Sequence, residues 1–253
     1  MTDHTKAYAA DSSLLGKFRR RAVRLMVRRP ARLTLTRPMV SFSFDDPPAS
    51  AAGAGAHILE AHGVRGSYFV SAGLAGEQGP MGRYADRTEL MAAVAVGHEL
   101  GCHTYSHLDC GQASAAEITA NVDRNSAALE AWGAPPTTTF AYPYGDVSLQ
   151  AKRALSSRYR MLRALHHGLI ETGSDLNQAP SVGIEGPQGQ ALALRWLNRA
   201  AVNSAWLILY THDVVEQPSQ WGCTPATLSA VVKAAVDGGF DIVTVAEGAR
   251  RLS

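Results

Sequence analysis

Two adjacent carboxylates, Asp45 and Asp46, directly follow residues 40–44, whose β-branched and aromatic side chains are typical of a buried strand. Because successive side chains of an extended segment point in opposite directions, one carboxylate can hold a metal ion while the other stays free as a base. The alternative is that residues 45–48 only end the strand and cap the helix that follows, since Asp and Pro are frequent at such positions. The pair alone leaves both interpretations open.

Two histidines, His103 and His107, are spaced so that both imidazoles can reach one point if the segment between them makes a helical turn. With one carboxylate they would supply three ligands and leave an open position, which suits catalytic Zn²⁺ and also other divalent ions. A lone pair of histidines at this spacing is weak evidence, and either one alone is more often structural. Combined with the Asp pair, the pattern predicts a metal centre, and we expect Zn²⁺.

A third histidine, His212, follows residues 205–210, the most strongly apolar predicted strand of the chain. A bound metal ion lowers the pKa of water from about 15.7 toward about 7 and polarises a carbonyl. The second Asp could then act as general base, and His212 as general acid for a departing amine. This set of residues predicts hydrolysis of an amide or ester without a covalent intermediate.

The elements that position these residues alternate between strands and helices, which predicts parallel βα units. The expected strands are residues 40–44, 66–71, 99–102, 137–141, 159–165, 181–185, 205–210 and 240–245, and the expected helices are residues 50–63, 88–96, 115–132, 149–157, 189–203 and 224–236. A chain of 253 residues is long enough for one large α/β domain. We therefore predict a distorted or incomplete (β/α) barrel with mostly parallel strands, in preference to an open sheet.

The polar residues follow one rule, because each comes just after the carboxyl end of a predicted strand. The rule covers Asp45, Asp46, His103, His107, Tyr144 and His212. In a parallel α/β barrel these strand ends gather on one face, where active sites are built. Four independent strand ends therefore favour a site over a set of structural residues.

The same motifs resemble those of the NodB-type polysaccharide deacetylases of carbohydrate esterase family 4, over about residues 38–248. The resemblance of residues 43–46 to the first motif implies Asp45 as base and Asp46 as metal ligand. Residues 103–107 resemble the second motif, which implies two histidine ligands. The family fold is a distorted (β/α) barrel, and its usual substrates are N-acetylated hexosamines in chitin, peptidoglycan and exopolysaccharides.

Two further motifs complete the resemblance. Residues 141–145 look like the third motif, which implies that the backbone N–H of Tyr144 helps to stabilise the oxyanion. Residues 209–213 look like the fifth, which implies His212 as acid. The basic N-terminal segment is also similar to that of enzymes serving bacterial adhesin or holdfast polysaccharide synthesis, whose sugars are assembled on a lipid carrier.

The chain departs from the family pattern at three places. Pro47 stands where the family has Gly, and Ala141 stands where the third motif begins with Arg. The fourth motif, an Asp that orients the acid histidine, has no clear match, and Asp175 is the best candidate. In the family the missing Arg holds the base Asp. Arg163 is our candidate replacement, because strand alternation places it on one face with Tyr159 and Met161; the alternative is an arginine solvated at the barrel rim.

Several residues near strand ends could contact sugar rings, and each could instead belong to core or rim packing. We expect substrate contacts from Tyr105, Tyr142, Pro143 and Trp221. The remaining histidines we treat as structural or surface residues.

The charge is uneven along the chain. Residues 1–37 contain ten Lys or Arg and two Asp, a formal charge of +8, whereas the whole chain has +2. Residues 14–29 would form an amphipathic helix with an apolar face and an arginine-rich face, a pattern typical of helices on anionic membrane surfaces. The alternative is that the apolar face docks on the body of the fold. We expect residues 1–37 to be an extension and residues 38–253 to be the deacetylase-like domain.

The three cysteines form no CxxC pattern and are odd in number, which favours reduced thiols and a cytoplasmic protein. No apolar run typical of a secretory signal follows the arginines, and no segment has the roughly 20 apolar residues that cross a bilayer. We expect a location in the cytoplasm, peripheral on the inner membrane if the basic helix binds there. We expect no nucleic-acid partner, and a homo-oligomer stays open.

These observations favour a metal-dependent N-deacetylase of polysaccharide that contains N-acetylglucosamine, either an exopolysaccharide or its lipid-linked precursor. One alternative keeps the chemistry and changes the substrate to a small amino sugar that is deformylated or deacylated. Another is a non-catalytic carbohydrate-binding barrel, which the missing Arg and the missing fourth motif would favour.

Overall fold

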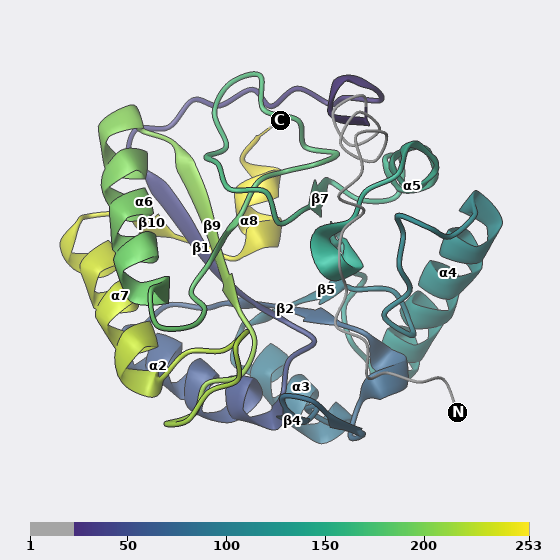
Figure 1. Cartoon of the computed structure of the whole chain (residues 1–253), viewed down its shortest axis with the longest axis horizontal. Coiled ribbons are helices and arrows are strands. Elements are labelled where there is room, and N and C mark those ends of the chain that lie inside the picture. The colour runs from purple at the N-terminus through teal and green to yellow at the C-terminus, as the bar shows by residue number, and fades with distance from the viewer. Residues whose placement is uncertain (1–22, 253) are drawn as a thin grey trace.

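Eight strands form one curled sheet with helices around its outside in the computed structural model, which describes residues 23–252 (Figure 1). The strands are β1 (Met39–Asp45), β2 (Ser67–Val70), β5 (Glu99–Cys102), β6 (Thr139–Ala141), β7 (Met161–Arg163), β8 (Val182–Gly183), β9 (Trp206–Thr211) and β10 (Asp241–Ile242). Their order is β7-β6-β5-β2-β1-β9-β8, β10 pairs with the beginning of β1, and every pair is parallel. The path begins at β7 and ends at β8, and an isolated bridge between Arg163 and Ala179 joins β7 to the segment before β8, so the fold is the distorted (β/α) barrel that the sequence predicts.

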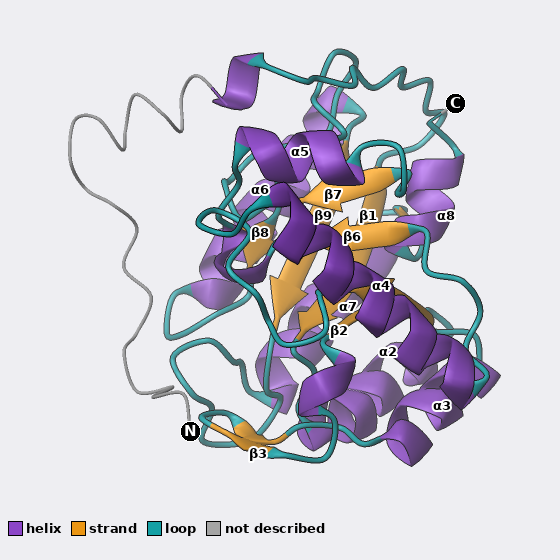
Figure 2. Ribbon diagram, turned by 90° about the vertical axis from the view of Figure 1, so that its right-hand side faces the viewer, coloured by secondary structure: helices purple, strands orange, loops and turns teal. Residues whose placement is uncertain are grey.

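The helices lie outside the sheet, with α6 and α7 on one side and α4 and α5 on the opposite side (Figures 1 and 2). Their bounds are α2 (Ala56–Ala61), α3 (Arg87–Ala95), α4 (Ala115–Trp132), α5 (Leu149–Leu155), α6 (Gly189–Asn203), α7 (Pro225–Asp237) and α8 (Val245–Arg250). Local sequence fixes several of their ends. At α4, Ser114 and Glu117 form a capping box, and Gly133 ends the helix in the left-handed region at φ 88°. The two signals explain why this helix matches its predicted bounds.

Strand β1 separates the hydrophobic core from the site because its two faces differ. Val40, Phe42 and Phe44 are buried in the apolar layer shared with α2, α6 and α7. Ser41 and Ser43 lie in the alternate positions, where Trp206 Nε1 donates to Ser41 Oγ at 3.0 Å and the Ser43 hydroxyl donates to the carbonyl of Leu209 at 3.0 Å. Alternation therefore continues the polar face to the last residue of the strand, where the first carboxylate stands.

Three features of the fold were not predicted. The glycine-rich loop after β2 contains a short hairpin of β3 (Gln78–Gly79) and β4 (Gly82–Arg83), and α8 follows the last strand. The helix after the Asp pair begins with a π-helical turn over Ala51–Gly55. Each of these elements is only a few residues long, so no periodic pattern could develop in its sequence.

The described part of the basic N-terminal segment packs against the body of the fold. The chain is helical over residues 23–25 and then extended, so the predicted helix over residues 14–29 does not continue past Leu25. Ala31 N donates to Ser174 O at 2.7 Å and Leu176 N donates to Arg29 O at 2.8 Å, which pairs this segment with residues 173–176. Residues 14–22 of the predicted helix lie outside the described residues. No helix within residues 23–252 is long and apolar enough to cross a membrane.

Candidate active site

Three side chains from neighbouring strand ends form a compact group that could hold a metal ion. Asp46 follows β1, and His103 and His107 follow β5, and one ligand atom from each lies within 4.8 Å of the others. Asp46 Oδ2 is 2.9 Å from His107 Nε2 and 3.9 Å from His103 Nε2. Asp46 and His103 are buried, whereas His107 is partly open to solvent.

The backbone reaches this arrangement through an uncommon conformation. Asp46, Thr104 and His107 have φ angles of 39°, 63° and 54°, in the left-handed region that non-glycine residues rarely adopt. Residues 103–107 do not form the helical turn on which the spacing argument depended. Instead, the loop has positive φ angles at Thr104 and His107, and the ring centroids of His103 and His107 lie 4.9 Å apart. Such outliers persist where the surrounding structure holds them, and they cluster at functional sites.

The protonation states of the group suit metal binding. Burial opposes the charged carboxylate, but the neighbouring imidazoles of His107 and His103 hold the pKa of Asp46 well below its usual range. Burial lowers the pKa of His103 to about 4, so its ring is neutral near pH 7. His103 Nδ1 donates to the carbonyl of Ala141 at 2.8 Å, which leaves Nε2 as the free ligand atom. An ionised carboxylate and a neutral, oriented imidazole are the forms that bind divalent metals.

The neighbouring carboxylate, Asp45, makes a buried ion pair on the polar face of β1. Arg163 Nη2 lies 2.5 Å from both Asp45 oxygens, and the Arg163 side chain is fully buried. Arg163 on β7 is paired with Ala141 on β6. Ala141 is the position at which the family pattern has its arginine. The guanidinium therefore reaches the carboxylate from the neighbouring strand, and Arg163 is not a solvated rim residue.

Tyr144 lies at the entrance of the group, on a 3-10 turn over Pro143–Gly145 that follows β6. Its φ of 59° and ψ of 2° place it in the left-handed region, and its side chain is 42% exposed. The Tyr144 ring meets the His107 ring edge-on, with centroids 4.3 Å apart. Tyr144 is thus the exposed aromatic side chain that borders the metal-binding group.

His212 follows β9, and because Phe44 pairs with Thr211, it stands across from Asp45 at the next position. His212 Nδ1 lies 3.2 Å from Glu185 Oε1 and 3.2 Å from the carbonyl of Trp221. Burial disfavours the imidazolium, yet the Glu185 hydrogen bond and the Asp45 and Asp46 charges raise the pKa of His212 above its usual value. The site therefore favours a protonated imidazole beside two carboxylates.

The prediction that Asp175 orients His212 is wrong. Asp175 Oδ2 instead accepts from Lys152 Nζ at 2.6 Å, and Asp175 Oδ1 accepts from the backbone N–H of Arg29 and of Asn177. The loop after β7 leads it toward α5 and the N-terminal segment, where it neutralises a fully buried lysine. Glu185, which follows β8, reaches His212 in its place. Glu185 was the last residue of the predicted strand over residues 181–185, so its nearness to a strand end was the signal that could have found it.

We expect Asp175→Ala to lower the free energy of unfolding by about 3–5 kcal/mol, because it leaves the charge of Lys152 buried without a partner. The measurement is urea unfolding, with Asp123→Ala as the matched control. Asp123 pairs with Arg158 at the surface, where an ion pair contributes up to about 1 kcal/mol. If the Asp175→Ala protein is as stable as the wild type but the pH profile of its kcat/KM is displaced, Asp175 acts on His212 after all.

Two of the predicted sugar contacts are buried. Tyr142 is 1% exposed, its hydroxyl donates to Asn177 O at 3.1 Å, and its ring packs on Phe140 in the core beside α4 and α5. Pro143 is buried as well. The alternation of β6 sends Tyr142 into this outer layer, so neither residue can contact a sugar without rearrangement.

The other two predicted sugar contacts, Tyr105 and Trp221, are partly buried and stay predictions. The guanidinium of Arg124 covers one face of the Tyr105 ring at 3.8 Å. Trp221 contributes its carbonyl to His212.

Tyr84, which sequence reasoning missed, pairs through its backbone with Pro48. Its pKa is raised to about 12 by burial and then by the charge of Asp46. The β3–β4 hairpin therefore lies against the turn that follows the Asp pair.

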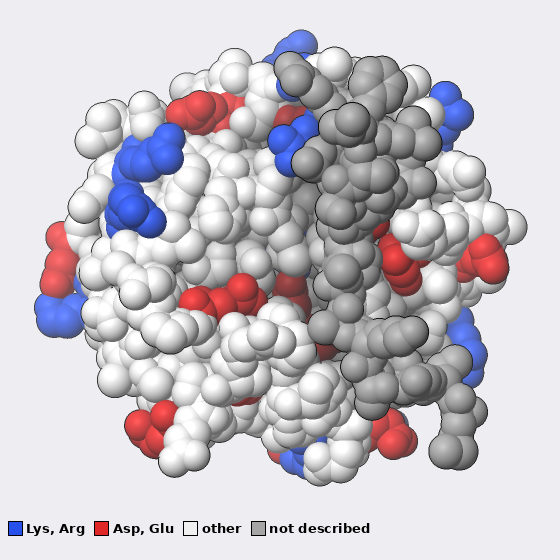
Figure 3. Space-filling model, in the orientation of Figure 1, with Lys and Arg blue, Asp and Glu red and all other residues white. Residues whose placement is uncertain are grey.

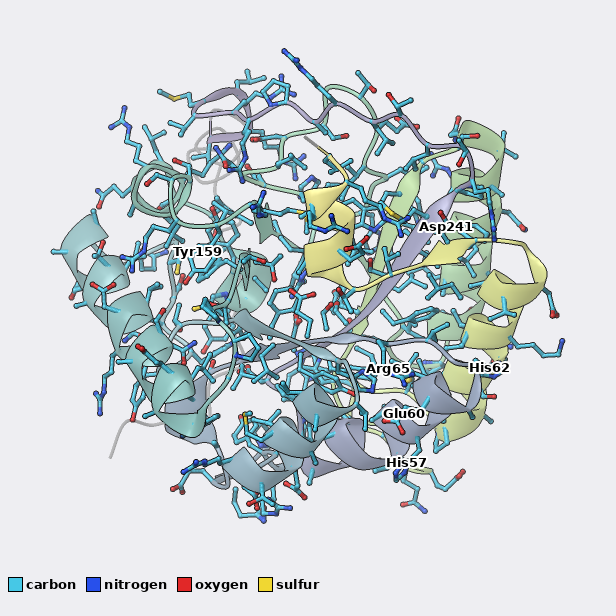
Figure 4. All side chains as sticks on the ribbon, turned by 180° about the vertical axis from the view of Figure 1, so that it is seen from behind. His57, Glu60, His62, Arg65, Tyr159 and Asp241 are labelled. Carbon is cyan, nitrogen blue, oxygen red and sulfur yellow. The ribbon has the colours of Figure 1, made fainter. Side chains whose placement is uncertain are left out.

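Histidines that we treated as structural or surface residues lie apart from the group. Seen from behind, His57 and His62 lie on and just after α2, at the rim of the fold (Figure 4).

On the face seen in Figure 3, acidic side chains are visible near the middle, and the visible basic side chains lie toward the periphery. The groups that could hold a metal within residues 23–252 reduce to the one described above.

Comparison with known proteins identifies the family. A family model described as polysaccharide deacetylase matches residues 32–161, just over half of the chain. The chain therefore belongs to the polysaccharide deacetylase family, a class of metal-dependent hydrolases. No curated protein matches the chain.

Solved structures show the same fold at low sequence identity. The Xyl-CE4 domain of a multidomain xylanase from the hindgut metagenome of Trinervitermes trinervoides matches with a TM-score of 0.61 and 20% identity, over 84% of this chain and 89% of that chain. The chitin deacetylase of the fungal pathogen Colletotrichum lindemuthianum matches with 0.59 and 21%, over 87% and 92%. A CE4 family pseudoenzyme from Bacillus anthracis matches with 0.60 and 14%, over 86% and 67%. Because this fold also occurs in a pseudoenzyme, the site residues have to decide the function.

Proposed function

We propose that the protein removes N-acetyl groups from N-acetylglucosamine residues of a bacterial exopolysaccharide, or of its lipid-linked precursor, in an adhesin or holdfast pathway. The observation that carries this proposal is the convergence of Asp46, His103 and His107 with an arginine-held Asp45 and a carboxylate-held His212. These are the parts that metal-assisted amide hydrolysis requires: three ligands, a base and an acid.

The roles follow from the positions of the side chains. Asp46, His103 and His107 would hold the divalent ion, which we expect to be Zn²⁺ and which, when bound, would polarise the acetyl carbonyl and lower the pKa of water. Asp45, fixed by Arg163, would take the proton of the attacking water. His212, on the neighbouring strand end, would give a proton to the departing amine. The backbone N–H of Tyr144 would donate to the developing oxyanion.

The non-catalytic alternative depended on two missing groups. Arg163 against Asp45 and Glu185 against His212 provide the same two kinds of contact from other strands. A binding protein would gain nothing from holding a base and an acid in this way, because a buried ion pair is a poor source of stability. The geometry therefore supports catalysis over binding alone.

The deciding experiment is release of acetate from N-acetylglucosamine oligomers of graded length, with and without added Zn²⁺ or Co²⁺. We expect release that is lost on chelation and that increases with chain length. Release of formate from an N-formyl sugar, with no dependence on length, would favour the small amino sugar alternative. No release with any metal would favour the binding alternative.

We also propose that the basic N-terminal segment holds the protein on the cytoplasmic face of an anionic membrane. Residues 14–22 lie outside the described residues, but the described end supports the idea. Leu25 is 73% and Met26 43% exposed, and Arg24 and Arg28 beside them are exposed too. Each basic residue near an anionic surface contributes about 1 kcal/mol, which salt weakens.

We expect the protein to sediment with phosphatidylserine vesicles at low salt and less at high salt. Changing both Leu25 and Met26 to Ser should weaken this binding, whereas Val202→Ser, which alters an apolar side chain on α6 that is 85% exposed, should not. If the Leu25 and Met26 double variant binds vesicles as well as Val202→Ser does, the alternative in which the segment only docks on the fold is favoured. In line with that docking, Lys152 Nζ donates to the carbonyl of buried Val23 at 3.0 Å.

A further inference from the structure

His212 is held at one ring nitrogen by two acceptors. A backbone carbonyl, that of Trp221, and a carboxylate oxygen, Glu185 Oε1, both lie 3.2 Å from His212 Nδ1. Because neither partner can donate a proton, Nδ1 must carry the hydrogen. Nε2 is then the ring atom that can exchange a proton with substrate. The contact with Glu185 therefore sets both the tautomer and the direction of the ring.

Glu185 is in turn held by β9, the strand that ends at His212. The Tyr210 hydroxyl donates to Glu185 Oε2 at 3.3 Å, and Ile184 N donates to Tyr210 O at 2.7 Å. Gly183 is paired with Tyr210, and a Cβ at this glycine would lie 2.7 Å from Glu185 Oε2. The missing side chain thus leaves room for the carboxylate to turn back over the strand.

Tyr210 also touches the arginine that holds the other carboxylate. The Arg163 guanidinium carbon lies 5.2 Å from the centre of the Tyr210 ring, and Arg163 is paired with Asp45. Burial raises the pKa of Tyr210 far above its usual value, so the hydroxyl keeps its proton and stays a donor. One tyrosine therefore contacts the partner of Asp45 through its ring and the partner of His212 through its hydroxyl.

We infer that Tyr210 is a positioning residue for His212: its hydroxyl aims Glu185, the carboxylate that holds the imidazole, while its ring packs on Arg163. The inference rests on the proposed function, because it assigns His212 as the group that protonates the leaving nitrogen. It goes further in making Tyr210 the link between the acid and the base of the site.

The charges around His212 determine the sign of the pH effect. Glu185 faces it from the loop after β8, Asp45 and Asp46 from the end of β1, and Tyr210 from β9. The neighbouring carboxylate of Asp213 is turned toward Ser219, whose hydroxyl and N–H donate to it. Removing the negative charge of Glu185 makes the imidazolium less stable, so His212 should lose its proton at a lower pH.

The first test is Glu185→Gln, which keeps an acceptor for Nδ1 and removes the charge. Nitrogen NMR of the His212 ring should show its titration midpoint displaced to lower pH, and the basic limb of kcat/KM should move in the same direction. Glu185→Asp, which restores the charge, should recover part of the displacement. An unchanged His212 midpoint in Glu185→Gln would overturn the assignment of Glu185.

The second test is Tyr210→Phe, which removes only the hydroxyl. We expect kcat to fall about 10-fold with little change in KM, as for the loss of one hydrogen bond to a charged group. In the Glu185→Gln background the same substitution should have a much smaller effect, because Tyr210 acts through Glu185. Tyr68→Phe is the matched control, since this buried hydroxyl donates to Ala51 O at 3.3 Å, away from His212.

Equal losses from Tyr210→Phe in both backgrounds would show that the tyrosine is only a packing residue. The NMR titration needs no activity, so the two failures are separable. An inactive wild-type protein would reject the proposed function, whereas a Glu185-dependent midpoint in that protein would still support the contact.

Discussion

Replacing His107 by Ala is expected to remove the bound metal and to lower kcat/KM by about 10³-fold or more, because the metal supplies several kcal/mol of transition-state stabilisation. His107 Nε2 is 2.9 Å from Asp46 Oδ2, and the side chain is the most exposed of the three candidate ligands. Removing it leaves two protein ligands, Asp46 and His103, whereas a catalytic Zn²⁺ site has three. The measurement is metal content by elemental analysis after dialysis, together with acetate release.

His57→Ala is the matched control for this variant. His57 lies on α2 at the rim of the fold and is exposed, so its loss should leave metal content and acetate release unchanged (Figure 4). Full metal occupancy in His107→Ala would remove His107 from the ligand set. Lost metal with retained acetate release would instead show that the chemistry does not need the ion.

Replacing Arg163 by Ala is expected to lower kcat by about 10²–10⁴-fold, the range by which a positioned general base accelerates reactions. The substitution leaves the Asp45 carboxylate, 3% exposed, buried without its cation. Breaking such a pair also costs about 3–5 kcal/mol of folding stability. Metal content should stay near that of the wild type, because the Arg163 guanidinium is hydrogen-bonded to Asp45 and Ser181 and its loss would act on Asp45.

The strand register offers a rescue that a purely structural role would not give. Ala141 is directly beside Arg163 on β6, so Arg163→Ala with Ala141→Arg places the guanidinium one strand away, next to the space that was vacated. We expect part of kcat to return in the double variant. Wild-type kcat in the Arg163→Ala protein would show that Asp45 acts without an arginine partner. Arg163→Lys should restore little, since a point charge cannot replace the planar donor group.

Local pattern was enough to predict the elements that bear the site. Asp45 and Asp46 could be placed because residues 40–44 alternate and end abruptly, and His212 because residues 205–210 are almost wholly apolar. Parallel strands then bring their carboxyl ends to one face whatever the details of the loops. The same alternation placed Arg163 on the inner face of β7, and the structure has it against Asp45.

Contacts that depend on the path of a loop could not be read in this way. Asp175 and Glu185 both lie between β7 and β9, and the place of Glu185 at the end of a predicted strand does not by itself show that it reaches His212. The loop after β7 folds back on the N-terminal segment, which gives Asp175 to Lys152, whereas the β8–β9 register places Glu185 at the site. Tyr142 was misplaced for a different reason: alternation in β6 puts it on the same outer face as Phe140, where the two side chains are buried beside α4 and α5.

The sequence by itself determined which residue types meet at this barrel face, because strand alternation and the common direction of parallel strands are local and repeated along the chain. Only the tertiary structure decided which partner each of them has. Arg163 and Asp45 are 118 residues apart, and His103 reaches the carbonyl of Ala141 across 38. Such pairs form through the register of neighbouring strands and the route of the loops between them. Those depend on the packing of the whole domain, and no short stretch of sequence specifies them.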